Sequence, residues 1–326
     1  MTDELSGTAA RATTVETASL ADSATEFCIR EAERTRISDW DLFPLAAERS
    51  GLFLPEGKFA IPVILQRIEK ALREGTGLAL IRVGDGEGAA LGMIRPEPNP
   101  IVSASFHDYF DLQNNCPLPM PDSVAFCKEL GASLQMADII GFRAFRKDEN
   151  ALIERAIRDG ARRSPLGFIY AREMLVDLLK TGLMRDKLLT TAWIHLELIP
   201  YIENMLSMTE KVVVISGRPQ LVRGFRKRLK GRSFEFIEVP PEAGEPCELD
   251  SSHFHLMFPK VKQALSKDLR GTLVLVGAGM FGKIYCAGVK KSGGVAVDMG
   301  SAFDLLSGLI TRPVFAQFKF DLPAWA

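Results

Sequence analysis

Two carboxylates and an arginine lie within six residues of each other in this chain of 326 residues, in the string Arg82-Val83-Gly84-Asp85-Gly86-Glu87. The string follows the apolar run Leu78-Ala79-Leu80-Ile81, which has the length of a buried strand. Carboxylates separated by one glycine at the end of a strand can reach one divalent cation. The two glycines would let a ligand approach the backbone, and the arginine could hold a phosphate oxygen. The pattern predicts a site for a metal and a diphosphate; a polar turn without a ligand is the alternative.

A second candidate for phosphate binding is the string Ser216-Gly217-Arg218-Pro219, which follows the apolar run 212–215. Ser216 has the chemistry of a helix N-cap, and Pro219 suits the first turn of a helix. Free N–H groups at a helix N-terminus favour an anion, and Arg218 would add a guanidinium. The string therefore predicts a phosphate contact, with a capped helix that binds nothing as the alternative.

A glycine-rich turn lies near the other end of the chain, in the string Gly277-Ala278-Gly279-Met280-Phe281-Gly282. It follows a strand-like run, precedes a helix-like one, and lies 16 residues before Asp298. This is the outline of a dinucleotide-binding turn. The alternative is a turn that packs a helix against a strand, with Asp298 beside the same cleft.

Several side chains are candidates for a general base. His253 and His255 follow Asp250, Glu248 and Cys247. Their spacing is loose for a metal cluster, so we expect a loop over the cleft in which His253 or Asp250 could accept a proton. Asp298 is a third candidate by its location. The pairs His107 with Asp108 and His195 with Glu197 are more typical of capping or packing.

Short apolar runs alternate with helical patterns along most of the chain. We expect strands over 78–83, 137–142, 166–170, 188–192, 212–215, 234–239, 273–276 and 295–297. Helices are expected over 60–73, 149–158, 172–179, 195–206, 220–230, 254–269 and 281–290. This alternation predicts an α/β fold with a doubly wound, mostly parallel sheet and helices on both faces. Ligands bind outside the carboxyl ends of such strands, where the strings described above would lie.

One α/β domain is expected over residues 26–326, after a disordered N-terminal tail over 1–25. Prolines at 96, 98, 100, 117, 119 and 121 predict a surface loop over about 95–122 that forms a lid or wall of the site. Five cysteines without a C-x-x-C pair favour a reducing cytoplasm. No sequence run is long and apolar enough to span a bilayer.

The net charge of −1 argues against nucleic acid as a partner. Seven basic residues and no acid occur between Arg218 and Arg232. A solvated helix face explains them, or else attraction to anionic lipid at the inner membrane surface. The chain contains neither a G-x-S-x-G elbow nor a Walker A string, so serine hydrolases and P-loop kinases have no support.

The string from Arg82 to Glu87 resembles the R-[FY]-G-D-G-E signature of the GT-D-fold glycosyltransferases, with Val83 at the aromatic position. The segment 273–300 resembles the C-terminal pattern of that family. There a strand, a G-A-G-like turn and a helix precede a strand that ends in Asp-x-Gly, here Asp298-Met299-Gly300. The resemblance covers about residues 60–310.

The resemblance implies a Rossmann-like sheet and transfer of a hexose from a nucleotide-sugar, with a UDP-sugar as the expected donor. The acceptor would be a glycan, a glycoprotein or a lipid-linked sugar. A divalent metal, expected to be Mn²⁺, would be held by Asp85 and Glu87. The catalytic candidates are Asp85, Glu87, Asp298 and His253. The binding candidates are Arg82, Gly84, Gly86, Ser216, Gly217, Arg218, Gly277 and Gly279. An NAD(P)-binding oxidoreductase that uses the turn 277–282, or a non-catalytic nucleotide or sugar-phosphate module, stays open.

Overall fold

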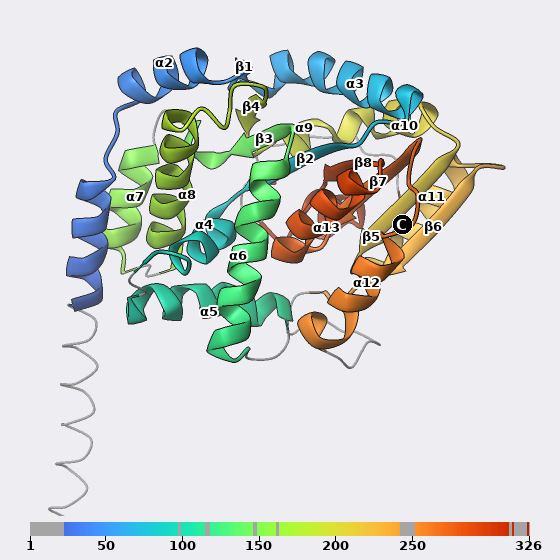
Figure 1. The fold of residues 1–326 in the computed structure, drawn as a ribbon. Coiled ribbons are helices and arrows are strands. Elements are labelled where there is room, and N and C mark those ends of the chain that lie inside the picture. Colours follow the sequence, from blue (N-terminus) through green and yellow to red (C-terminus); the bar gives the residue numbers. More distant parts are fainter. Residues whose placement is uncertain are drawn as a thin grey trace, which may run out of the picture.

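A parallel sheet of eight strands forms the centre of the protein (Figure 1). The computed structural model describes residues 23–96, 99–114, 118–145, 149–160, 163–241, 252–312, 315 and 325. The strands are β1 Leu52–Leu54, β2 Leu78–Val83, β3 Ile139–Phe142, β4 Leu188–Thr191, β5 Lys211–Ser216, β6 Ser233–Glu238, β7 Thr272–Gly277 and β8 Val295–Asp298. Their order in the sheet is β1-β4-β3-β2-β8-β7-β5-β6, and all neighbouring pairs are parallel.

Both faces of the sheet are buried, because successive side chains of a strand point to opposite faces. In β2, Leu78 and Leu80 belong to one apolar cluster, whereas Ala79, Ile81 and Val83 belong to the other. Central strands of this kind read as continuous apolar runs rather than as alternating ones. This is why the strands at 78–83, 212–215 and 273–276 could be recognised from sequence.

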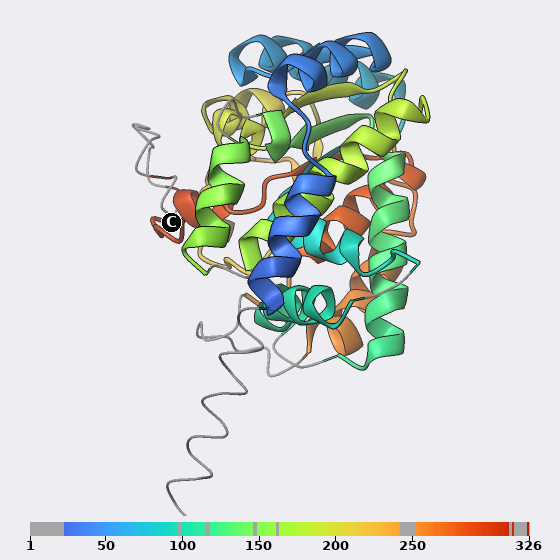
Figure 2. The same cartoon turned by 90° about the vertical axis from the view of Figure 1, so that its left-hand side faces the viewer.

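Helices cover both faces (Figures 1 and 2). The first face packs against α2 Asp39–Arg49, α4 Asp85–Gly92, α5 Pro100–Asn114, α6 Met120–Met136, α7 Glu149–Arg158, α8 Arg163–Lys180, α12 Phe258–Ala264 and α13 Gly279–Lys291. The second packs against α3 Gly57–Glu74, α9 Ile194–Glu197, α10 Ile202–Ser207, α11 Leu221–Arg228 and α14 Ala302–Leu306. Residues 23–34 are also helical. The expected α/β doubly wound fold is confirmed.

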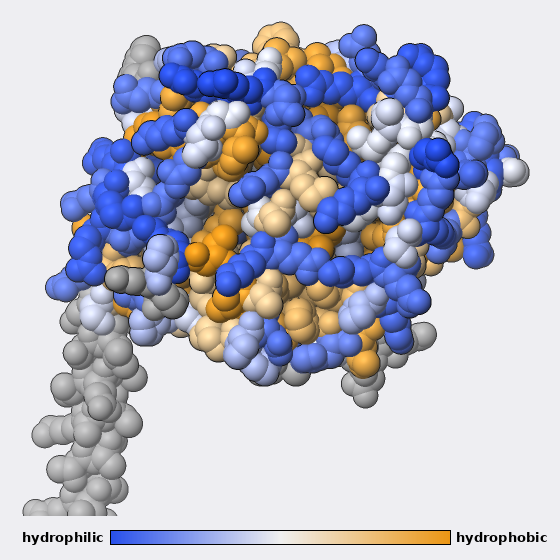
Figure 3. Space-filling view, in the orientation of Figure 1, coloured by the Kyte–Doolittle hydropathy of each residue, from blue (hydrophilic) through white to orange (hydrophobic). Residues whose placement is uncertain are grey.

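In the orientation of Figure 1 the surface carries many hydrophilic residues, with apolar areas between them (Figure 3). Among the described residues, no helix combines the length and the hydropathy that crossing a bilayer requires.

The structure differs from the sequence-based expectation at residues 166–170 and at the first strand. Residues 166–170 were expected to form a strand but belong to α8. A short apolar run in a buried helix has the same composition as a buried strand, so periodicity cannot separate them. The edge strand β1 has only three residues, all half-buried, and gave no signal.

Where the structure describes it, the segment 95–122 is mostly helical rather than the surface loop that its prolines suggested, since it contains α5 and the start of α6. Pro100 is the first residue of α5. An N–H at this position has no partner within any helix, so a proline, which lacks the N–H, is tolerated there. Phe106 and Phe110 of α5 are fully buried. The expected tail lies outside the described residues up to residue 22, and residues 23–25 are helical.

Helices α4 and α8 touch through their backbones, and this contact positions the start of α4. A Cβ on Gly88 would lie 1.7 Å from the carbonyl oxygen of Gly167, and a Cβ on Gly167 would lie 2.2 Å from that of Asp85. Neither neighbour is a flexible side chain that could move aside. Glycine is therefore required at both positions by close approach rather than by backbone angle.

We expect Gly88→Ala to lower the free energy of unfolding by about 3 kcal/mol, since the new methyl group would force two helix backbones apart. The matched control is Gly288→Ala in α13, where a Cβ would meet nothing within 4 Å. That change should raise stability by about 0.5–1 kcal/mol through helix propensity. Urea denaturation of both variants measures the difference. Equal stabilities would contradict the contact described here.

Candidate active site

A cleft of about 730 Å³ runs along the carboxyl ends of the strands. At the β4 and β3 end it is lined by Trp193, Arg143 and Phe168. Its middle is lined by residues 82–87, Lys283 and Gly300. At the β5 and β6 end it is lined by Ser216, Gly217, Arg218 and Pro241. The strands of the N-terminal half lie on one side of the β2–β8 pair and those of the C-terminal half on the other. This pair is the topological switch point, where ligands of open α/β sheets bind.

Arg82 and Asp298 join the two halves at this switch point. Arg82 Nη2 lies 3.1 Å from Asp298 Oδ1, and the Arg82 backbone N–H donates to Asp298 Oδ2 at 3.2 Å. Arg82 Nε donates to the carbonyl oxygen of Asp298 at 3.2 Å. These contacts fix the Arg82 side chain across the end of β8.

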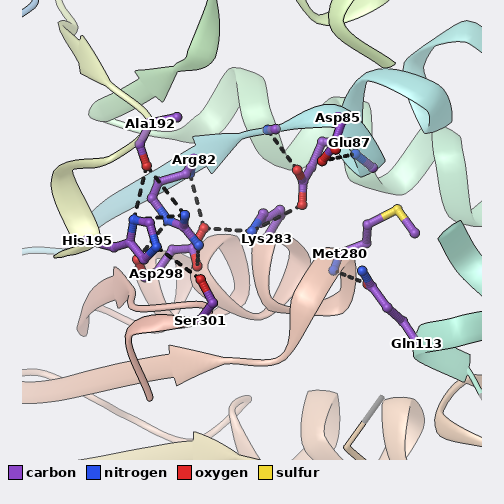
Figure 4. Close-up of polar contacts among 12 residues, drawn as sticks. Arg82, Asp85, Glu87, Gln113, Ala192, His195, Met280, Lys283, Asp298 and Ser301 are labelled. Carbon is purple, nitrogen blue, oxygen red and sulfur yellow. Dashed lines mark hydrogen bonds and ion pairs between the residues drawn. The ribbon is translucent and has the colours of Figure 1, made fainter. Parts of the chain in front are cut away.

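Lys283 of α13 lies between two carboxylates (Figure 4). Its Nζ is 2.7 Å from Asp298 Oδ2 and 3.2 Å from Glu87 Oε1. Glu87 Oε2 also accepts the backbone N–H of Gly84 at 2.8 Å, which caps the first turn of α4. All three side chains are buried. A buried charge needs such partners because its transfer from water is costly.

The neighbouring charges favour the ionised forms of Asp298 and Lys283. Burial by itself raises the pKa of Asp298, but the charges of Arg82 and Lys283 outweigh it and keep the pKa below the ordinary aspartate value. Burial lowers the pKa of Lys283, but Asp298 and Glu87 outweigh it and raise that pKa. As placed, Asp298 is therefore a weak proton acceptor that orients Arg82 and Lys283 rather than a good general base.

Asp85 has different surroundings from Glu87. It begins α4, where the helix dipole favours a carboxylate. Its Oδ1 accepts from the N–H of Gly86 at 3.1 Å and its Oδ2 from the hydroxyl of Tyr109 at 3.3 Å. Within the described part of the chain, no cationic side chain pairs with it. Asp85 is thus the carboxylate of the cleft that a ligand cation or hydroxyl can use.

The β5 end differs from the expectation for Ser216. Helix α11 begins at Leu221 with Gln220 as its N-cap, so Ser216 is not the cap. Its Oγ accepts the backbone N–H of Arg218 at 3.2 Å. Arg218 Nε donates to Asp304 Oδ1 at 2.7 Å, so this guanidinium already has a carboxylate partner. Ser216, Gly217 and Arg218 do line the cleft, as predicted.

The glycine turn places Gly277 and Gly279 on the cleft wall. Gly279 has a φ of +53°, which favours glycine. The side-chain oxygen of Gln113 accepts the N–H of Met280 at 2.7 Å (Figure 4). That N–H lies in the first turn of α13, where a dinucleotide phosphate would bind. A side chain from α5 therefore fills the position that the dinucleotide hypothesis requires.

The two buried histidines near the cleft are neutral at ordinary pH. His253 Nε2 lies 2.8 Å from the Tyr285 hydroxyl, and burial lowers the pKa of His253 to about 3. Its conjugate acid is too strong for His253 to be an effective base. His195 Nδ1 lies 3.0 Å from Arg82 Nη1, and burial together with the charge of Arg82 lowers its pKa well below the usual value. Asp250, the remaining base candidate, lies outside the described residues.

The sequence matches the model of the GT-D-like family, described as a GT-D fold-like domain, over residues 61–306. That stretch contains both the 82–87 string and Asp298. The chain belongs to the GT-D-like family. Membership supports a glycosyltransferase, as the resemblance implied.

Some solved structures show a distant similarity to this GT-D-like protein. A selenomethionine form of domain of unknown function 1792 (DUF1792) has a TM-score of 0.42 and 15% identity, covering 82% of this chain and 86% of its own. A DUF1792 structure described as having a distinct glycosyltransferase fold has a TM-score of 0.41 and 14% identity, with the same coverage of 82% and 86%. A new glycosyltransferase (DUF1792) from Streptococcus sanguinis has a TM-score of 0.37 and 14% identity, covering 79% and 85%. No curated protein matches the chain. The family assignment rests on the family model.

In this GT-D-like protein the fit to a divalent metal depends on Asp85. Among the described residues, no group of three or more histidine, cysteine, aspartate or glutamate side chains could hold a metal. Glu87 would have to leave the Gly84 N–H and Lys283 to join Asp85 on one cation. Magnesium-like ions, however, often use one protein carboxylate and complete their shell with substrate phosphates and water. Asp85 fits that arrangement.

Several residues of the cleft were not recognised in the sequence, among them Lys283, Tyr109 and Arg143. Lys283 had a readable signal, since it is the single charged residue in the otherwise apolar stretch 279–287. Tyr109 lies in α5, where the prolines of the sequence suggest a loop. Arg143 directly follows β3, and a basic residue at the end of a strand gives no pattern of its own.

The buried state of His253 predicts a pH dependence of stability. Its pKa in the folded protein, about 3, lies below the unfolded value near 6.5. Between these values the unfolded chain binds a proton that the folded protein does not, so stability is complete above about pH 6.5 and decreases as the pH falls. From pH 7.5 to 5, this one residue should cost about 2 kcal/mol.

Urea denaturation at both pH values should therefore show a smaller loss for His253→Gln than for the wild type. The matched control is His255→Gln, because His255 is exposed in the same helical turn. It should keep the wild-type pH dependence. An identical loss in all three proteins would mean that His253 titrates in the folded state as it does in water.

Proposed function

We propose that this protein is a hexosyltransferase that moves a sugar from a nucleoside-diphosphate sugar, expected to be a UDP-sugar, to a glycan, glycoprotein or lipid-linked acceptor. One observation carries the proposal beyond the family. The cleft at the switch point combines a partly buried cation, Arg82, and a buried one, Lys283, with Asp85, a carboxylate that has no cationic partner among the described residues. A diphosphate and its counter-ion need such a combination of charges.

The reaction breaks the bond between the sugar carbon and the diphosphate oxygen and forms one between that carbon and an acceptor oxygen. The proton of the acceptor hydroxyl passes to the departing diphosphate or to water. The diphosphate leaves with additional negative charge, which fixed cations stabilise most strongly in a site shielded from water. Arg82 is held by Asp298, and Lys283 by Asp298 and Glu87, so neither has to reorganise during the step. Glu87 and Asp298 thus act by positioning cations.

A divalent cation, expected to be Mn²⁺, would bind to Asp85 together with the donor. When bound, it supplies charge that neutralises the departing diphosphate. Asp85 is oriented for this by the hydroxyl of Tyr109 and the N–H of Gly86. With one carboxylate available, the protein should bind the metal weakly unless a nucleoside diphosphate is present.

Thermal-shift measurements with UDP, GDP and NAD(P), each with Mn²⁺ or EDTA, test this proposal. A ligand at about 100 times its dissociation constant stabilises a protein by roughly 2.7 kcal/mol. We expect stabilisation by a nucleoside diphosphate only with metal and its loss in Asp85→Asn. The matched control, Asp177→Asn, changes an exposed aspartate of α8 and should behave as the wild type.

Stabilisation by NAD(P) in the presence of EDTA would instead favour the oxidoreductase. Ligand binding without any transfer of labelled sugar to a mixed glycan pool would favour the non-catalytic module.

We also propose a peripheral contact with anionic lipid at the cytoplasmic membrane surface, through Arg223, Arg226, Lys227 and Lys230. These four side chains of α11 and its end are exposed, and α11 has no acidic residue in its first turn. Each basic residue near an anionic bilayer contributes about 1 kcal/mol of attraction.

Flotation with vesicles that contain phosphatidylserine should recover the wild type. Vesicles of phosphatidylcholine alone should not. The double change Arg226→Glu with Lys227→Glu should abolish recovery, whereas Lys70→Glu with Arg73→Glu, an equal charge reversal on exposed positions of α3, should not. Recovery that ignores lipid charge would eliminate the membrane contact.

A further inference from the structure

Arg143, at one end of the cleft, differs from the other cationic side chains of the cleft in its partners. Arg82, Lys283 and Arg218 have carboxylate partners at 3.1, 2.7 and 2.7 Å. Arg143 also lines the cleft, but within the described residues no carboxylate pairs with it. Its Nε is buried and has no hydrogen-bond partner in that part of the chain.

Aromatic rings hold Arg143 in place. Its Cζ lies 4.0 Å from the ring centre of Phe168 and 5.5 Å from that of Trp193. A guanidinium that lies over aromatic rings can keep N–H groups for a planar anion. Because Nε is buried, the terminal Nη groups are the donors that a ligand can reach.

The three side chains come from three separate elements that meet only in the folded protein. Arg143 directly follows β3, Trp193 follows β4, and Phe168 lies in α8 beside the glycine contact with α4. They therefore form a preformed wall at one end of the cleft. Asp85 lies in the middle, and the Ser216–Arg218 turn lies at the other end.

We propose that Arg143, Phe168 and Trp193 form a binding subsite for a phosphate or carboxylate group carried on a ring. The inference rests on the proposed function, since this end of the cleft opens onto Asp85. A bidentate contact from Arg143 holds the anionic group, and the half-buried Trp193 offers a face for the ring that carries it. Two sources supply this chemistry: the nucleoside diphosphate of the donor, or an acidic sugar of the acceptor.

Removal of Arg143 distinguishes a ligand-binding role from a structural one. Replacing an arginine that pairs with buried carboxylates destabilises a protein, because the carboxylates then remain buried without a counter-charge. Arg143 has no such partner among the described residues, so Arg143→Met should leave the midpoint of urea denaturation unchanged or raise it. A clearly lowered midpoint would mean that Arg143 is structural and would overturn the proposal.

Calorimetric titration measures the binding itself, with three probes: UDP with Mn²⁺, glucuronate and uncharged glucose. We expect Arg143→Met to weaken binding of at least one anionic probe about tenfold or more. Arg143→Lys should recover only part of it, since an ammonium lacks the fork. The matched control is Arg155→Met, an exposed arginine of α7, which should bind as the wild type.

The outcomes separate the two sources. Weaker binding of UDP alone places the donor diphosphate at Arg143. Weaker binding of glucuronate with unchanged UDP places an acidic acceptor there. Unchanged binding of both, or no binding of either by the wild type, overturns the subsite. Failure of the proposed function would look different. Anion binding would still depend on Arg143, but Asp85→Asn would leave UDP binding unchanged and no sugar would be transferred.

Discussion

A buried carboxylate has to be matched by positive charge, and in this protein that requirement joins the two halves of the chain. Asp298 ends β8 and receives hydrogen bonds from Arg82 at the end of β2 and from Lys283 in α13. The contacts between Asp298 and Arg82 span 216 positions in sequence. They exist only when β2 and β8 lie side by side, so the pairing that brings the halves together also creates the charged floor of the cleft.

The same network explains why the two carboxylates of the D-x-E string differ in role. On a helix, side chains three or four residues apart lie on one face, whereas side chains two residues apart do not. Once Asp85 begins α4, Glu87 is turned back toward the N–H of Gly84 and toward Lys283. Asp85 stays directed to the cleft and to Tyr109. For both to share a ligand, Glu87 would have to leave the Gly84 N–H and Lys283.

The sequence predicted the architecture well because buried parallel strands leave continuous apolar runs, as in β2, β5 and β7. It also predicted which loops meet, since the carboxyl ends of parallel strands lie at one edge. It failed where composition is ambiguous. Residues 166–170 read as a strand although they form a helix, and the prolines before α5 suggested a loop. Arg143 and Trp193 follow the neighbouring strands β3 and β4, but Phe168 could not be grouped with them, because its position depends on how α8 packs rather than on any spacing in the chain.

The crossing of α4 and α8 has a consequence for how this cleft can be altered. The carbonyl of Asp85 rests where a side chain at position 167 would be, and Phe168 is the next residue along. Any larger residue at 167 would displace the acidic group and the aromatic wall together. Changes of ligand preference at this end of the cleft are therefore confined to the cleft-lining positions 143, 168 and 193, and the glycines at 88 and 167 have to be kept.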